Sequence, residues 1–295
     1  MAFEGFAQAR ITTSDPGVEI NVRHGGNGPP LLLLHGNPLS HHSWHRIADR
    51  LARRFTVVAT DLRGYGDSSK PRGLPDHSNY TFGRMALDQV EVMAALGFDR
   101  FQVAGHDRGA RVAFRMALDH PDRVSRVAFM DILPTHHVFA HSTREWGLNS
   151  YHWFFMAQPY DFPERLLAGN EAYYIRKKLM KQGVGKGGFS EEEVLEYIRV
   201  CTPEQIHGVC SDYRATAFVD YEVDREAFER GIRVQQPALV LWGEHSHTQK
   251  YYSPADVWPR YAARIERTVA LPCGHYPNEQ SPEETLRELD GFFEA

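Results

Sequence analysis

The feature that most constrains this sequence is a Gly-His-Asp-Arg-Gly motif at residues 105–109, between a predicted strand and a predicted helix. Residues 101–104 form a short run typical of a buried strand, and residues 109–118 are predicted to be helical. A strand-to-helix turn this sharp strains its central residue and brings backbones close together, so it needs small residues at its flanks. The motif therefore predicts that the side chain of Asp107 stands above the carboxyl edge of a sheet.

Strands and helices alternate along most of the chain, which favours an α/β fold with a mostly parallel sheet and helices on both faces. The alternation stops between residues 135 and 232, where the chain is rich in aromatics and is predicted to form helices and loops, with a flexible stretch at 183–188. We therefore expect a core of residues 1–134 and 233–295 with an inserted helical cap at 135–232. Strands are predicted at residues 18–23, 31–34, 55–60, 101–104, 124–130, 237–242 and 268–271, and helices at 81–97, 109–118 and 282–293.

The length of 295 residues suits one large domain with an insertion, and the composition argues against several classes of protein. A net charge of −5 argues against a nucleic-acid partner. The three cysteines have no disulfide-framework spacing, and the first residues lack the pattern of a signal peptide. The apolar run at 31–34 is too short to span a membrane. We expect a soluble cytoplasmic protein with neither a nucleic-acid nor a membrane partner.

The central residue of this turn is an aspartate, whereas many such turns carry a serine. The aspartate restricts which reactions the turn can catalyse. A carboxylate that attacks a carbonyl gives a labile anhydride, which is a poor route for ester hydrolysis. A carboxylate that displaces a leaving group from a saturated carbon gives an alkyl ester that water can cleave afterwards. Asp107 is therefore predicted to be a nucleophile whose target is a carbon bearing a halide or an epoxide oxygen.

A general base and an acid are expected to complete the catalytic set. His275 follows a strand-like stretch on a late loop, which suits a base that activates water for the second step. Two carboxylates are candidates for the acid: Asp131 at the end of one predicted strand and Glu244 just after another. We favour Asp131, because a carboxylate there can reach the histidine from the neighbouring strand and triads are defined by geometry. A helix-capping role for Asp131 remains the alternative.

With these residues identified, the sequence resembles the fluoroacetate and haloacetate dehalogenases of the α/β-hydrolase superfamily over nearly its whole length. The resemblance implies a triad of Asp107, Asp131 and His275. It also implies that Arg108 and Arg111 bind the carboxylate of the substrate. An Arg fork suits a planar carboxylate and would place the adjacent carbon for in-line attack. Either arginine could instead form a structural ion pair.

The resemblance further implies a halide pocket made by His152, Trp153 and Tyr213 of the inserted segment. Donors that converge on a departing halide stabilise charge that appears only as the bond breaks. An aromatic cluster in a helical region can also be plain core. Two positions depart from the family pattern: Asn37 follows the first core strand, as in haloalkane dehalogenases, and Met180 is our best match to a missing cap tryptophan. Both departures bear on fluoride preference and pocket size.

Hydrolytic dehalogenation of a small haloacid, such as a haloacetate to glycolate and halide, is the favoured function. The small anionic substrate would need no metal or organic cofactor, and the sequence has no phosphate loop or metal-spaced His/Cys cluster. Epoxide hydrolysis through the same Asp107 is the alternative, with Tyr151 and Tyr213 protonating the epoxide oxygen. A third hypothesis is a ligand-sensing protein that keeps the fold but catalyses no reaction. The family resemblance also implies a homodimer.

Overall fold

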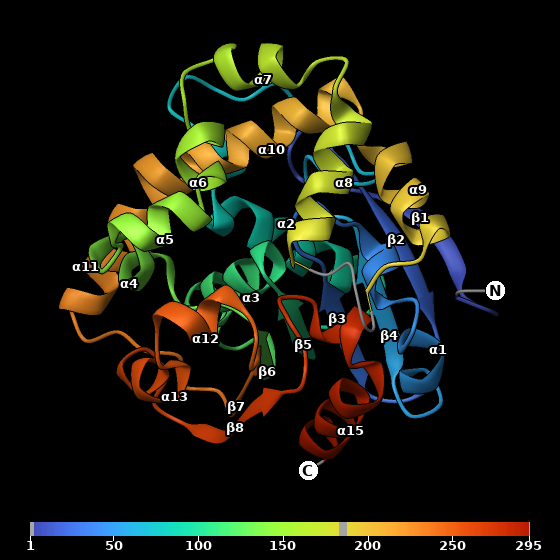
Figure 1. The fold of residues 1–295 in the computed structure, drawn as a ribbon. Helices are drawn as coiled ribbons and strands as arrows, with labels where there is room; N and C mark the ends of the chain where they lie inside the picture. The colour runs from blue at the N-terminus through green and yellow to red at the C-terminus, as the bar shows by residue number, and fades with distance from the viewer. Residues whose placement is uncertain (1–2, 183–187, 295) are drawn as a thin grey trace.

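The computed structural model describes residues 3–182 and 188–294, without the side chains of residues 180–182 (Figure 1). The predicted flexible stretch at 183–188 therefore lies almost wholly outside the described residues. Met180 falls within a helix, but its side chain is likewise outside them, so its match to a cap tryptophan stays a prediction. No helix in the described ranges is long and apolar enough to cross a membrane.

One eight-stranded sheet forms the centre of the molecule, in the order β1-β2-β4-β3-β5-β6-β7-β8. The strands from β4 to β8 in this order run parallel, whereas β2 pairs antiparallel with both β1 and β4. The α/β-hydrolase fold expected from the sequence is therefore confirmed. The strands are β1 (Ala7–Thr12), β2 (Glu19–Gly25), β3 (Pro30–Leu34), β4 (Thr56–Thr60), β5 (Phe101–His106), β6 (Val124–Met130), β7 (Ala238–Gly243) and β8 (Ile265–Leu271).

Helices cover both faces of the sheet, and alternate residues of the strands point into two separate cores (Figure 1). In β3, Leu32 and Leu34 join the core beneath α2 and α3, whereas Leu31 and Leu33 join the core beneath α1 and α15. The run of leucines is thus apolar throughout because both of its faces are buried. The helices of this part are η1 (His41–Trp44), α1 (Ala48–Leu51), η2 (Ser78–Tyr80), α2 (Phe82–Ala95), α3 (Arg108–Asp119), α12 (His247–Tyr251), α13 (Pro254–Val257), η4 (Trp258–Arg260), α14 (Pro277–Gln280) and α15 (Pro282–Phe293).

The chain between β6 and β7 forms helices and no strand within its described residues, and these helices lie together at one end of the sheet (Figure 1). The helix η3 is a π-helix that continues α10. The elements are α4 (Thr135–Ala140), α5 (Arg144–Asn149), α6 (His152–Met156), α7 (Phe162–Leu167), α8 (Glu171–Gln182), α9 (Glu191–Val200), α10 (Pro203–Ala215), η3 (Thr216–Asp220) and α11 (Tyr221–Glu229). We call this set the inserted helices.

Two details of the first strands differ from the sequence prediction. β1 was not predicted, and it forms an edge strand with a mostly exposed surface. The second strand was expected to alternate buried and exposed residues, yet Asn21 is buried as well as its apolar neighbours. Its side-chain amide donates to Asp61 Oδ2 at 2.9 Å, so a hydrogen bond offsets the cost of burying a polar group.

Candidate active site

Asp107 occupies the sharp turn between β5 and α3, with a backbone φ of 47° and ψ of −117°. Its flanking glycines are required because the surrounding backbone comes too close for a side chain. A Cβ atom on Gly105 would lie 2.5 Å from Gly109 O, and one on Gly109 would lie 2.4 Å from Leu34 O. The turn therefore fixes the Asp107 carboxylate at the carboxyl end of β5.

Asp131 and His275 lie beside this carboxylate. The His275 ring donates from Nδ1 to Asp131 Oδ2 at 2.5 Å, and its Nε2 lies 3.9 Å from Asp107 Oδ2. The alternative acid, Glu244, has a side chain 47% exposed and pairs with His245 at 3.2 Å. The structure thus brings Asp131, and not Glu244, to His275.

The three side chains form a coupled set of charges. Burial opposes the ionised form of Asp107, but contact with His275 outweighs burial and holds the pKa of Asp107 well below its usual range. Burial also opposes the ionised form of Asp131, but its hydrogen bond with His275 outweighs burial and lowers the pKa of Asp131. Burial lowers the pKa of His275, but its two carboxylate contacts prevail and raise that pKa to about 9. His275 is therefore protonated near neutral pH while both carboxylates carry charge.

Asn37 follows β3 and contacts both the turn and the inserted helices. Its backbone N–H donates to Asp107 Oδ2 at 3.0 Å, and its side-chain Nδ2 donates to the Tyr213 hydroxyl at 3.2 Å. Its Oδ1 is buried and has no hydrogen-bond partner among the described residues. The Asn37 backbone thus offers a donor where negative charge on the Asp107 carboxylate needs stabilising.

Arg108 is fully buried and already holds an ion-pair partner. Its Nε donates to Asp212 Oδ2 at 2.9 Å, and its Nη2 donates to Asp212 Oδ1 and Thr216 Oγ1. The guanidinium carbon lies over the rings of Phe82 and Tyr213, 4.8 Å and 4.1 Å from their centroids. Its Nη1 is buried and unpartnered in the described part of the chain. Asp212 therefore compensates the charge of Arg108 and leaves its Nη1 as the one guanidinium nitrogen without a partner among the described residues.

Arg111 is buried one turn further along α3 and forms no ion pair within the described ranges. Its Nη1 donates to Leu133 O at 2.9 Å and Thr135 Oγ1 at 3.1 Å, and its guanidinium carbon lies 4.6 Å from the Trp153 ring centroid. Its Nε has no partner there. Burial, followed by repulsion from Arg108, lowers the pKa of Arg111 to about 10. A buried cation in these surroundings favours a bound anion.

His152, Trp153 and Tyr213 gather on the side of the inserted helices that faces α3. Trp153 and Tyr213 are buried with ring centroids 6.2 Å apart, and the half-buried His152 lies 5.8 Å from Tyr213. Tyr213 and Trp153 lie against the guanidinium groups of Arg108 and Arg111. The predicted halide-binding and carboxylate-binding residues therefore form one continuous cluster.

Two histidines of this region are not among the site residues predicted from the sequence. His106 donates from Nε2 to the backbone oxygen of His275 at 2.6 Å. His247 begins α12, and its ring centroid lies 4.8 Å from that of His275. Burial, helped by the charge of His275, lowers the pKa of each to about 4, so both are neutral near pH 7. His106 stands inside the turn motif and could have been singled out, whereas His247 is one of 16 histidines with no diagnostic spacing.

A cavity of about 20 Å³ lies directly against Asp107. Arg111, Trp153, His247 and Thr248 also line it. Larger grooves of about 400 and 660 Å³ lie elsewhere, beside α7 and α10. The small cavity, rather than the larger grooves, therefore coincides with the predicted catalytic residues.

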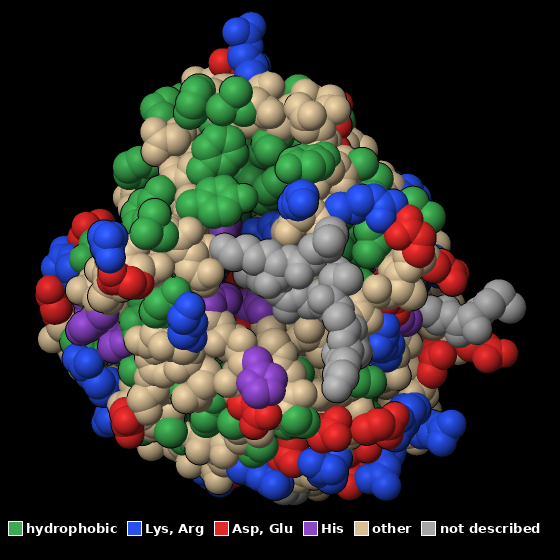
Figure 2. All heavy atoms as spheres, viewed as in Figure 1, with side chains coloured by type: hydrophobic (Ala, Val, Ile, Leu, Met, Phe, Trp, Pro, Cys, Tyr) green, Lys and Arg blue, Asp and Glu red, His purple; other side chains and the backbone are tan. Residues whose placement is uncertain are grey.

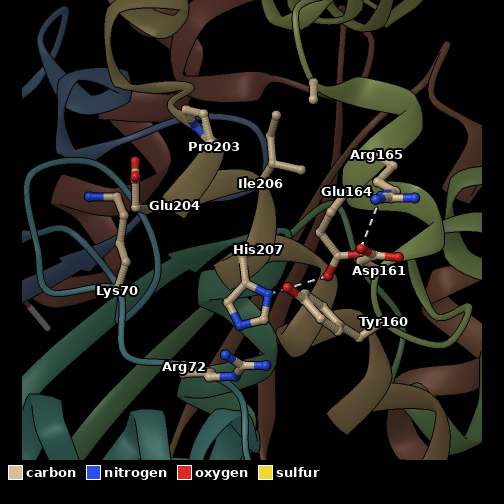
Figure 3. Close-up of a pocket in the computed structure, with 11 residues that line it drawn as sticks. Lys70, Arg72, Tyr160, Asp161, Glu164, Arg165, Pro203, Glu204, Ile206 and His207 are labelled. Atoms are coloured by element: carbon tan, nitrogen blue, oxygen red, sulfur yellow. Dashed lines mark hydrogen bonds and ion pairs between the residues drawn. The ribbon is translucent and has the colours of Figure 1, made fainter.

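Two carboxylates of the groove beside α7, Glu164 and Asp161, form ion pairs (Figure 3). Glu164 contacts His207 at 3.3 Å and also receives two hydrogen bonds from Arg214. Asp161 pairs with Arg165 at 3.1 Å. These carboxylates are thus engaged in ion pairs and are poorly placed to act as a nucleophile or general base.

Two clusters bring three possible metal ligands together: Asp131, His247 and His275, and His45, Glu193 and Glu279. In the first, the hydrogen bond between Asp131 and His275 engages two of the three side chains. In the second, Glu193 already binds His45 at 2.8 Å and Arg46 at 2.6 Å. Neither cluster is predicted from the sequence, because each joins residues far apart in the chain.

The chain is similar to several known proteins. The family described as alpha/beta hydrolase fold matches residues 29–172. A fluoroacetate dehalogenase from Burkholderia sp is 43% identical over 98% of this chain and 94% of its own length. A soluble epoxide hydrolase from Corynebacterium sp. (strain C12) is 33% identical over 91% of both chains.

Solved structures place the chain in the same group of folds. A crystal structure from Nostoc sp PCC 7120, provisionally described as an α/β hydrolase, is 46% identical and covers 99% of both chains with a TM-score of 0.94. The near full-length identity to the Burkholderia sp relative is high enough to assign a family. The chain is therefore a hydrolase with the α/β-hydrolase fold and belongs to the fluoroacetate dehalogenase family.

Proposed function

We propose that the chain hydrolyses the carbon–halogen bond of a small haloacid, such as a haloacetate, through an ester on Asp107. The observation that carries this proposal is the pairing of two groups in one cavity: the Asp107 carboxylate and the buried cation Arg111, which has no carboxylate partner in the described ranges. A haloacetate carries a carboxylate one bond from the carbon that must be attacked. Arg111, with the free Nη1 of Arg108 beside it, would hold that carboxylate and present the carbon to Asp107.

In the first step, Asp107 attacks the α-carbon, the carbon–oxygen bond forms and the halide leaves with the bonding electrons. The low pKa of Asp107 keeps it ionised for this attack. His152, Trp153 and Tyr213 would receive the halide, since donors placed at the developing charge lower the barrier. Asn37 would steady the hydroxyl of Tyr213 through its side-chain amide.

In the second step, water attacks the ester carbonyl carbon of Asp107, His275 takes the water proton, and the 2-hydroxy acid leaves. His275 must be neutral to accept this proton. Ester formation removes the negative charge of Asp107, which is one of the two carboxylates that raise the pKa of His275. The first step would therefore prepare the histidine for its role as base in the second, while Asp131 holds its ring in place.

We propose that residues 135–232 act as a cap over a core of residues 1–134 and 233–295. The inserted helices contribute Trp153 and Tyr213 to the site, and their Asp212 fixes Arg108. This arrangement supports a division of labour in which the core performs the chemistry and the cap selects the substrate. No cofactor is required by the proposed steps, which use only the chain, a small anionic substrate and water.

Epoxide hydrolysis by the same nucleophile is the second candidate, because an additional tyrosine lies near the site. Opening an epoxide leaves an alkoxide that needs a proton donor, and two tyrosines can share that task. Tyr151, one of the two expected from the sequence, is 52% exposed. Tyr174 is a better partner for Tyr213, since its hydroxyl is buried and has no partner among the described residues. Arg111, which forms no ion pair with the described residues, would have no role in epoxide hydrolysis. Epoxide hydrolysis is therefore the second candidate.

Halide release from fluoroacetate and chloroacetate, read by ion chromatography with styrene oxide hydrolysis run alongside, tests the proposal. We expect halide and glycolate in equal amounts, and loss of both in Asp107→Asn. Chloride without fluoride would keep the mechanism and narrow the substrate. Diol formation without halide from either acid would contradict dehalogenation and establish the epoxide reaction instead.

We further propose that two copies associate through the inserted helices. Hydrophobic side chains gather over α5, α6, α7 and α8 (Figure 2). Exposed apolar surface of this extent typically marks an interface, and a second copy is the simplest occupant. Light scattering should give the mass of a dimer, and Leu148→Lys combined with Phe162→Lys should give a monomer. The exposed large residues of these helices and of the segments between them are Leu148, Tyr151, Phe154, Tyr160, Phe162, Leu166 and Tyr173.

We also propose a cytoplasmic location. Cys201, Cys210 and Cys273 are all buried free thiols in the structure. Burial raises the pKa of the Cys201 and Cys273 thiols to about 12, which keeps both in the unreactive protonated form. Unpaired cysteines are the usual condition in a reducing compartment.

A further inference from the structure

We propose that His247 is a positioning residue that holds the hydrolytic water beside His275 for cleavage of the Asp107 ester. This inference rests on the proposed function, because it assigns a role within the second step of that reaction. It starts from the position of the His247 ring, 4.8 Å from that of His275 and tilted by 53°. His247 and Asp107 both line the small cavity of the site.

The cavity is of the right size and polarity for one water molecule. A volume of about 20 Å³ exceeds the minimum that a single water needs, and a bound water requires polar partners. Asp107, Arg111, Asp131, His247 and Thr248 supply polar groups to its lining. A water here would be within reach of the carboxyl group that becomes the ester.

The local structure holds His247 at this place through its neighbours. Ser246 caps α12 by accepting a hydrogen bond from the Gln249 backbone N–H at 3.3 Å. The hydroxyl of Thr248 donates to the backbone oxygen of Asp131 at 3.2 Å. The first turn of α12 is therefore attached to the residue that also orients His275. His247 itself forms no side-chain hydrogen bond with the described residues, so its ring nitrogens remain available to a water.

In the second step, the attacking water can use a second hydrogen-bond acceptor besides His275. The attacking water directs a lone pair at the ester carbonyl carbon and one hydrogen at Nε2 of His275. Its other hydrogen needs an acceptor, because an unfixed water samples unproductive orientations. A neutral imidazole has one bare nitrogen, and a protonated one has none. Burial, together with the charge of His275, lowers the pKa of His247 to about 4, which preserves that acceptor.

The atoms of the step balance without any further reactant. The water oxygen bonds to the carbonyl carbon of the ester, and one water proton moves to His275. The bond between that carbon and the oxygen of the hydroxy acid then breaks. The departing alkoxide takes the proton from His275, and the second water proton is lost from the restored Asp107 carboxylic acid to solvent. His247 only accepts a hydrogen bond throughout and is neither protonated nor consumed.

Rapid-quench kinetics with chloroacetate can separate the two steps for wild type, His247→Leu and His247→Gln. Leucine removes the acceptor at similar volume, whereas the glutamine amide oxygen restores one. We expect His247→Leu to release the first equivalent of chloride within about twofold of the wild-type rate and to hydrolyse the ester about tenfold more slowly, the effect of one neutral hydrogen bond. Intact-protein mass should show the ester accumulating in His247→Leu, and His247→Gln should recover most of the rate.

His245→Gln is the matched control, since His245 lies two residues away with a side chain 72% exposed. It should match wild type in both steps. His247→Asn, whose amide is too short to reach the water, serves as a second variant should the leucine variant not fold, and should also hydrolyse the ester slowly. Ester hydrolysis at the wild-type rate in His247→Leu or His247→Asn would overturn the proposal. Equal slowing of both steps in all three variants would also overturn it, since that result marks a structural role. Absence of chloride from the wild type would instead refute the proposed function.

Discussion

The two halves of the site are built in different ways. At the edge of the sheet, Asp107 and Asp131 follow the neighbouring strands β5 and β6, and both have a positive φ, 47° and 51°. The backbone at the two strand ends places these carboxylates. In the inserted helices, Tyr213 and Trp153 are held by side-chain contacts, and each lies against one arginine of α3. Under the proposed function, the sheet edge would determine which reaction occurs, and the inserted helices would determine which substrate reaches it.

The largest effect should come from the sheet edge. Asp131→Asn removes the charge that orients His275 and is expected to lower turnover by about 10³- to 10⁴-fold, as loss of the acid does in comparable triads. Glu244→Gln is the control, since that side chain is exposed and pairs with His245. Steady-state halide release measures both variants. A larger loss of turnover in Glu244→Gln than in Asp131→Asn would make Glu244 the acid of the triad. It would also contradict the role given to the sheet edge.

A smaller effect, on the free energy of unfolding, is expected at the ion pair of Arg108 with Asp212, where the two halves of the site join. Asp212→Asn leaves the buried guanidinium of Arg108 without its counter-charge, which should lower the free energy of unfolding by about 3–5 kcal/mol. Asp161→Asn provides the control, since its ion pair with Arg165 is largely exposed. Chemical denaturation followed by circular dichroism measures the difference. Equal stability of the two variants would show that the Arg108 pair contributes little to holding the halves together.

The proposed halide pocket should show a still smaller and more selective effect on the rate. Tyr213→Phe removes one hydroxyl donor and is expected to slow halide release about tenfold, while ester hydrolysis stays unchanged. The same variant leaves the side-chain amide of Asn37 without its acceptor. Single-turnover measurements of halide and glycolate separate the steps. Slowing of ester hydrolysis instead would place Tyr213 in the chemistry of the sheet edge.

The smallest effect is expected when the pH is varied. Asp107 stays ionised because its pKa lies well below the usual range, so halide release should be flat between about pH 6 and 9. Ester hydrolysis should rise with pH, since His275 must lose its proton to act as base. Its pKa of about 9 in the resting enzyme should fall in the ester form, when Asp107 no longer carries charge. Pre-steady-state rates across this range test both profiles, and an ester-hydrolysis rate that falls with increasing pH would contradict the role of His275.

The same contrast explains what the sequence could predict. The turn motif and the strand periodicity predicted the fold, which is confirmed, and they directed attention to Asp107, Asp131 and His275, whose roles stay predictions. These features are local, so they leave a pattern in neighbouring residues. The ion pair of Arg108 with Asp212 joins residues 104 positions apart, and no local pattern reveals it. His247 escaped notice for the same reason, because it becomes informative only when α12 packs beside His275.

The central claim is that Asp107 forms a covalent ester with a haloacid and that His275 directs its hydrolysis. Incubating His275→Asn with chloroacetate, followed by intact mass and peptide mapping, tests this most directly. The account predicts one equivalent of chloride and a stable carboxymethyl group on the peptide that contains Asp107. Chloride release with no adduct on that peptide, or an adduct on another residue, would contradict it.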